Sequence, residues 1–124
     1  MSHRPRLCAS LLLAFATAIP AATANAPSKL SSPEDIEKEF ATVPCEDKDR
    51  LAVVKALFEK AGAPADAIRI DTYDDVENLV VVKPGESAEK IVIGAHYDKT
   101  ADGCGAIDNW TGQVAISHLY RTVR

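Results

Sequence analysis

The sequence predicts a protein of α/β class. Apolar residues recur at helical spacing between residues 47 and 61, and again after residue 109. Between these stretches lie short runs that are rich in β-branched residues, at 67–72, 77–83 and 91–93. Alternation of helical and strand patterns along one chain is typical of a sheet that is covered by helices.

The amino terminus has the pattern of a signal peptide. Arg4 and Arg6 give a positively charged start, an apolar stretch follows at 7–19, and Ala22-Thr23-Ala24 is a small-x-small cleavage site. Cleavage is expected after Ala24, with Ala26 as the alternative. The apolar stretch is too short to span a membrane comfortably, and no later stretch is apolar over the roughly 18 residues that a span needs.

The expected organisation is therefore a signal peptide at 1–24, a flexible leader at 25–30 and a domain at 31–124. The mature chain is expected to be secreted or periplasmic, without membrane attachment. Loss of Arg4 and Arg6 changes the net charge from 14 − 18, or −4, to 12 − 18, or −6. An acidic chain without a basic patch argues against nucleic acid as a partner.

The domain is expected to begin with a short helix. Ser31 or Ser32 suits the capping position, Pro33 suits the first helical position, and Glu34 lies near the positive end of the helix dipole. This helix should run to about Ala41.

A second helix is expected from Asp47 to about Ala61, where Gly62 ends it. Its apolar face carries Leu51, Val54, Leu57, Phe58 and Ala61. Its opposite face is expected to be solvated and to carry Asp47, Lys48, Arg50, Lys55, Glu59 and Lys60.

Three strands are expected after this helix. The run 67–72 alternates as a half-exposed strand, and Asp74-Asp75 is predicted as a turn rather than as a carboxylate pair for acid and base chemistry. A strand is predicted at 77–83, and residues 78–95, which include the run 91–93, are predicted as a hairpin-linked pair of strands. Because Ile91-Val92-Ile93 is β-branched throughout, it is expected to be buried on both faces.

His96 and Asp98 follow the last of these strands. Side chains two apart on an extended segment point to the same side, so both are expected to face the crevice at the carboxyl end of the sheet. Asp108 follows a glycine-rich loop and should reach the same crevice. An imidazole nitrogen and a carboxylate oxygen are ordinary zinc ligands, and Asp98 is placed to accept the other ring N–H of His96.

Two cysteines remain once Cys8 is removed with the signal peptide. In an oxidising compartment, a disulfide between Cys45 and Cys104 is the favoured interpretation. The alternatives are two free thiols, or Cys104 as an additional metal ligand.

The last helix is expected from about Asn109, packed on the sheet. The residues that favour this packing are Val114, Ile116, Leu119, Tyr120 and Val123. His118 lies ten residues beyond Asp108, about 15 Å along a helix axis, and is expected to be an ordinary helix-face residue that does not share the metal.

The segment 78–124 resembles the two-zinc exopeptidases of the family of bacterial leucyl aminopeptidase, aminopeptidase Y and glutamate carboxypeptidase. The resemblance rests on Asn78-Leu79-Val80-Val81, on His96-Tyr97-Asp98 and on Gly105-Ala106-Ile107-Asp108-Asn109-Trp110-Thr111-Gly112. It implies that His96 binds one zinc, that Asp98 belongs to the catalytic machinery as the residue that orients His96, and that Asp108 bridges two zinc ions.

The resemblance also implies a three-layer αβα sandwich of the zinc-exopeptidase (phosphorylase/hydrolase-like) type, here incomplete. The family site needs a Glu-Glu pair, a further Asp and a late His, none of which can be assigned in this sequence. The expected function is thus that of a secreted, aminopeptidase-like zinc exopeptidase acting on peptides, in a chain that is truncated and inactive alone.

Two alternatives stay open: a non-catalytic secreted metal-binding or partner-binding α/β module, and a small structural protein in which His96 and Asp98 are only a hydrogen-bonded pair. A sheet that ends at Ile93 would also expose an edge, so self-association is expected.

Overall fold

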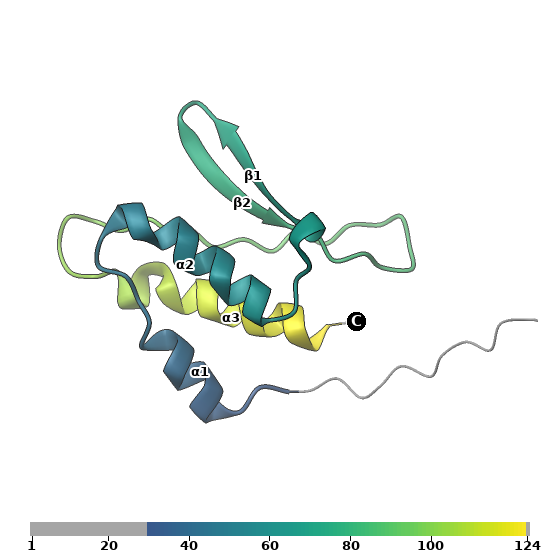
Figure 1. Ribbon diagram of the computed structural model, residues 1–124, viewed down its shortest axis with the longest axis horizontal. Coiled ribbons are helices and arrows are strands. Elements are labelled where there is room, and N and C mark those ends of the chain that lie inside the picture. The colour runs from purple at the N-terminus through teal and green to yellow at the C-terminus, as the bar shows by residue number, and fades with distance from the viewer. Residues whose placement is uncertain (1–29, 124) are drawn as a thin grey trace, which may run out of the picture.

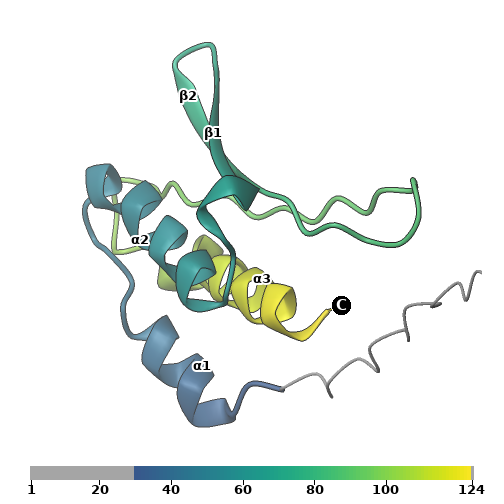
Figure 2. The same ribbon diagram turned by 45° about the vertical axis from the view of Figure 1, so that its right-hand side comes forward.

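The computed structural model describes residues 30–123. The signal peptide predicted at 1–24 lies outside the described residues, as does the predicted leader up to residue 29. The element order is α1 (Pro33–Phe40), α2 (Asp47–Lys60), β1 (Ile68–Tyr73), β2 (Val76–Val81) and α3 (Thr111–Thr122). In Figures 1 and 2, α2 and α3 lie side by side, α1 lies next to α3, and the β1–β2 hairpin projects away from the helices.

The capping residue of α1 is Ser32. Its hydroxyl oxygen accepts a hydrogen bond from the Asp35 backbone N–H at 3.1 Å, and Pro33 occupies the first helical position, as predicted. The helix ends at Phe40.

Helix α2 ends at Lys60, and Gly62 follows it with a φ of +96°, as predicted for a glycine after a helix. The expectation that Arg50 lies on the solvated face is wrong, because its side chain is completely buried. Arg50 lies four, seven and eight residues before Val54, Leu57 and Phe58, so helical geometry places it on the apolar face.

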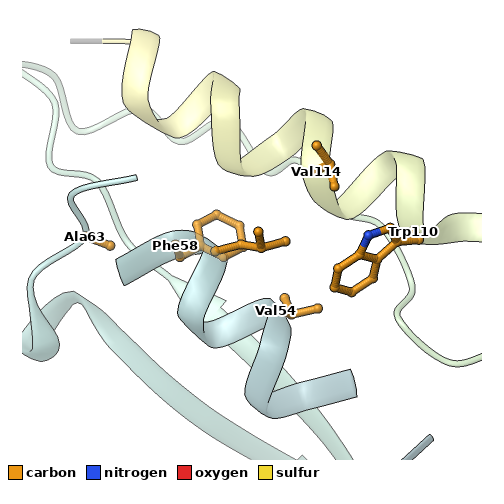
Figure 3. Packing of buried hydrophobic residues seen from close by; sticks show 6 residues of the cluster. Val54, Phe58, Ala63, Trp110 and Val114 are labelled. Atoms are coloured by element: carbon orange, nitrogen blue, oxygen red, sulfur yellow. The ribbon is translucent and has the colours of Figure 1, made fainter. Parts of the chain in front are cut away.

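The hydrophobic core lies between α2 and α3. Val54 and Phe58 of α2 face Trp110 and Val114 at the start of α3 (Figure 3). Trp110 is fully buried, and the Phe58 ring meets the Tyr120 ring edge-on at 6.0 Å between centroids. Burial of an aromatic side chain of this size contributes a large share of the apolar area in so small a core.

The buried face of α3 differs from the predicted one. Gln113, Val114, Ser117 and His118 are buried, whereas Leu119 is 38% exposed and Val123 is 43% exposed. The helix packs against α1 and α2 rather than on a sheet. Its polar side chains can be buried because each has a partner: Gln113 donates to the Ala95 carbonyl, Ser117 donates to the Val114 carbonyl of the same helix, and His118 contacts Glu39 of α1.

A buried carboxylate connects α1 with the ends of the other two helices. Glu39 is 2% exposed, and its oxygens lie 2.9 Å from Lys60 Nζ, 2.8 Å from His118 Nε2 and 3.5 Å from Arg121 Nη2. The prediction that His118 stays apart from the metal motif is confirmed. It is not the ordinary helix-face residue that was expected, because it is buried and its Nδ1 also contacts the Ser31 hydroxyl.

The two strands form an antiparallel hairpin in which Tyr73 pairs with Val76. The two-residue turn between them, Asp74-Asp75, has φ values of 49° and 64°, which suit the right-handed twist of a hairpin. The predicted turn is confirmed. The predicted pairing of 78–95 as a hairpin is wrong, because the partner of β2 is β1.

Residues 91–93 form no strand, contrary to prediction. Ile91 is 90% exposed, Val92 is 92% exposed and Ile93 is 54% exposed. A β-branched run becomes a buried strand only where neighbouring strands satisfy its backbone hydrogen bonds. Within 30–123, no backbone hydrogen bond joins residues 91–93 to another segment. The α/β class is confirmed by three helices and a two-stranded sheet, whereas the described part of the chain does not form the expected three-layer sandwich.

The predicted disulfide between Cys45 and Cys104 is present. It joins the linker between α1 and α2 to the glycine-rich loop before Asp108, and it removes the two alternatives of free thiols and of Cys104 as a ligand. Over residues 30–123, no helix is both long enough and apolar enough to cross a membrane.

Candidate metal centre

The structure brings the three predicted site residues together. Asp98 Oδ1 lies 2.9 Å from His96 Nδ1, and Asp108 Oδ1 lies 3.0 Å from His96 Nε2. His96 and Asp98 point to the solvent side of an extended segment, while Tyr97 between them points toward the core. The imidazole therefore lies between two carboxylates, one from its own segment and one from the loop that leads into α3.

The site is open to solvent. The side chains of His96, Asp98 and Asp108 are 51%, 78% and 78% exposed. The hydrogen bond to Asp98, followed by that to Asp108, raises the pKa of His96 above its usual value, because both carboxylates favour the protonated ring. Without a metal, the ring can donate both of its N–H groups; with a metal on Nε2, only the bond to Asp98 would remain.

The donor pair fits a single zinc ion. Zinc–nitrogen bonds of about 2.0–2.1 Å and zinc–oxygen bonds of about 2.0–2.2 Å at a tetrahedral angle place two ligand atoms about 3.3 Å apart. The observed separation of His96 Nε2 and Asp108 Oδ1 is 3.0 Å, so a small movement would let both bind one cation. Asp98 holds the opposite ring nitrogen, the usual second contact of a metal-binding histidine.

Contacts with the helices hold the His96 segment in place. Gln113 of α3 donates its amide to the Ala95 carbonyl at 2.7 Å. Gly112 allows this approach, because a Cβ on it would come within 2.9 Å of the Ala95 Cβ. On the other side, the Tyr97 hydroxyl donates to the Glu77 carbonyl of β2, and burial raises the pKa of that hydroxyl.

Asp108 is positioned by the backbone of its loop. Gly105 begins the turn Ala106–Trp110 with a φ of +59°, and Asp108 has extended φ and ψ values of −117° and 92°. The chain becomes helical only after this point, so the Asp108 carboxylate leaves the turn toward His96 instead of following the helix face.

Sequence reasoning missed Arg50 and Gln113, the two side chains that anchor this region from α2 and α3. Arg50 donates to the carbonyls of Tyr97, Pro44 and Cys104. The helical spacing of Arg50 from Val54 is a signal for its burial, whereas its charge favours an exposed position. Polar residues such as Gln113 give no comparable signal in a hydrophobicity pattern.

The described residues form no complete metal site. Within 30–123, no group of three or more His, Cys, Asp or Glu side chains is arranged to hold a metal ion. His96 and Asp108 offer one donor atom each, fewer than the four ligands that a zinc ion usually takes.

Comparison with known proteins agrees with the motifs. Residues 78–124 match the model of Peptidase family M28. The match begins in β2 and includes His96, Asp98 and Asp108, so the resemblance to the two-zinc exopeptidases is confirmed over this segment. No curated protein and no solved structure matches the chain.

Residues 78–124 are thus similar to a segment of a metallopeptidase, a class of hydrolase. The matching family is M28, whose peptidases are generally zinc-dependent.

Proposed function

We propose that residues 78–124 are the first part of a zinc exopeptidase catalytic domain of aminopeptidase type, with His96 and Asp108 as metal ligands and Asp98 as the residue that orients His96. The observation that carries the proposal is the position of the His96 ring between the two carboxylates, at 2.9 Å and 3.0 Å. The family match over the same residues supports it.

Each side chain has a distinct task in this proposal. Asp98 accepts the Nδ1–H of His96, which leaves the Nε2 lone pair free to bind a cation. Asp108 supplies a negatively charged oxygen next to that nitrogen. Bound zinc would activate a water molecule and polarise the scissile carbonyl of a peptide substrate.

We further propose that this chain alone has little or no peptidase activity. A metal-activated water needs a general base to accept its proton, and a second cation needs its own ligands. The described residues place neither beside His96 and Asp108. The complete activity would then require the later parts of a catalytic domain.

Export is also part of the proposal. The disulfide between Cys45 and Cys104 supports it, because disulfides persist in oxidising compartments. The predicted cleavage after Ala24 can be checked by the intact mass of the chain recovered from the periplasm or medium of an expressing cell. A chain that retains residues 1–24 inside the cell would contradict it.

Zinc titration of the purified chain against a competing chromogenic chelator tests the site. Binding is expected to weaken at least tenfold in His96→Ala and in Asp108→Asn. Asp102→Asn is the matched control, because Asp102 is an exposed carboxylate in the loop that precedes Asp108. Absence of zinc binding by the unaltered chain, or equal losses in all three variants, would refute the assignment.

A second candidate function is that of a non-catalytic metal-binding module, favoured because no group of three or more potential ligands is arranged together among the described residues. A chromogenic aminoacyl substrate in the presence of zinc tests both candidates. Robust turnover would refute the non-catalytic module and also the proposal that the chain is inactive alone. Zinc binding without turnover is the result that both candidates predict.

A further inference from the structure

A buried guanidinium lies beneath the candidate metal centre. Arg50 of α2 has no exposed surface, and its side chain crosses from the helix to the two segments that carry the site. Its Nε donates to the Tyr97 carbonyl, and its Nη1 donates to the carbonyls of Pro44, at 2.7 Å, and Cys104, at 2.8 Å. It also lies over the Trp110 ring, 5.5 Å from the centroid.

The carbonyls that Arg50 binds lie next to the metal ligands. Tyr97 stands between His96 and Asp98, and Cys104 begins the short loop that ends at Asp108. One side chain therefore holds both halves of the site, the extended segment and the loop, against the same helix.

No strand pairing shares this task within the described residues. Between residues 83 and 104, no backbone group bonds to another backbone group of the segment 30–123. Side-chain donors hold the segment instead, with Arg50 at the Tyr97 carbonyl and Gln113 at the Ala95 carbonyl. The separation of 3.0 Å between His96 Nε2 and Asp108 Oδ1 thus depends on contacts from α2 and α3.

The loop is shaped to fit the guanidinium. A Cβ at Gly105 would lie 3.4 Å from Arg50 Nη2, 2.8 Å from the Lys99 Cβ and 2.9 Å from the Asp108 carbonyl oxygen. Gly105 also has a φ of +59°, which side chains rarely adopt. Only glycine lets the loop lie this close to Arg50 without displacing Asp108.

We propose that Arg50 is a positioning residue of the metal centre, which sets the distance between His96 and Asp108 through the Tyr97 and Cys104 carbonyls. This inference rests on the proposed zinc site. A lysine cannot replace the arginine, because its single ammonium group cannot present donors in the fixed planar directions of a guanidinium. Arg50 acts through the backbone and does not itself touch metal or substrate.

Zinc titration of the full-length chain tests the inference with three variants. Arg50→Lys is expected to weaken zinc binding at least tenfold. Arg69→Lys is the matched control for the chemical change, because Arg69 is an exposed residue of β1 that pairs with the exposed Asp71. Val54→Ala is the control for stability, because it removes core packing from the same face of α2 and leaves Arg50 and its three carbonyl contacts unaltered.

Hydrogen–deuterium exchange gives a readout that needs no metal. Arg50→Lys is expected to increase exchange in peptides that cover 95–108 more than in those that cover β1 and β2. Val54→Ala is expected to increase exchange across the whole fold and to leave zinc affinity unchanged where the protein is folded.

The outcomes separate this inference from the proposed function. If the unaltered chain binds no zinc, the proposed function fails, and exchange at 95–108 still decides whether Arg50 positions the segment. If zinc binds equally to the unaltered chain and to Arg50→Lys, or if Val54→Ala loses as much affinity, the inference is overturned. Should Arg50→Lys fail to fold, Gly105→Ala displaces the loop instead, and unchanged zinc affinity in that variant overturns the inference.

Discussion

The disulfide between Cys45 and Cys104 is expected to contribute several kilocalories per mole to the stability of the chain. The two cysteines are 59 residues apart in sequence. A cross-link that closes a loop of this size removes about 14 cal/mol/K of entropy from the unfolded chain, which corresponds to about 4.2 kcal/mol at 25 °C. Cys45 is exposed and Cys104 is half-buried, so replacing both by alanine loses little packing.

Urea unfolding followed by tryptophan fluorescence measures this contribution. Trp110 is the single tryptophan of the sequence and is fully buried, so its emission reports on the core between α2 and α3. For an m-value of about 1–3 kcal/mol/M, the midpoint of the double Cys45→Ala, Cys104→Ala variant should fall by more than about 1 M. Complete unfolding without urea would agree with the same reasoning.

Two controls accompany the measurement. All variants carry Cys8→Ser, so that Cys8 cannot form a mixed disulfide. Reduction of the parent protein should reproduce the loss of stability, and reductant should not change the double variant. A midpoint that falls by less than about 0.5 M would refute the argument from loop entropy.

Three further predictions concern other parts of the chain. In the metal-free protein, His96 is expected to titrate above pH 6.5 by NMR, and Asp98→Asn should lower its pKa, because the larger of its two carboxylate contacts is lost. The stabilisation that His96 contributes is present below about pH 6.5 and is lost as the pH rises through the raised pKa of the folded state. An NMR titration midpoint at or below pH 6.5 would contradict the prediction of a raised pKa. Glu39→Gln should lower the free energy of unfolding by about 1–3 kcal/mol, because it removes the buried carboxylate that pairs with Lys60 and Arg121 and contacts His118. The exposed Glu37→Gln on the same helix should change it by less than about 0.5 kcal/mol. Val92→Lys should reduce self-association in sedimentation experiments. The Val92 side chain is 92% exposed, and the backbone of this apolar segment has no backbone hydrogen-bond partner among residues 30–123. An unaltered chain that is already monomeric at high concentration would refute this prediction.

Local sequence was enough to predict several elements, because their causes lie within a few residues. Ser32 and Pro33 begin α1, Gly62 follows α2, and Asp74-Asp75 forms the hairpin turn. In each case the deciding interaction is a capping bond or a backbone conformation that depends on the immediate neighbours.

The candidate site was also predictable in its identity. His96 and Asp98 lie two apart on an extended segment, which puts them on one side whatever else the fold does. The separation of 3.0 Å between Asp108 Oδ1 and His96 Nε2 depends on the tertiary structure. The turn at Gly105 and the contacts of Arg50 with both segments bring these two side chains together.

The largest errors concern residues whose environment is set by distant parts of the chain. Ile91-Val92-Ile93 has the composition of a buried strand, yet a strand exists only where a partner supplies hydrogen bonds, and none is present for it among the described residues. Arg50 shows the opposite case, since a charged residue is buried because three carbonyls and the Trp110 ring surround it. Hydrophobicity is a property of each residue, whereas satisfaction of its polar groups is decided by tertiary neighbours.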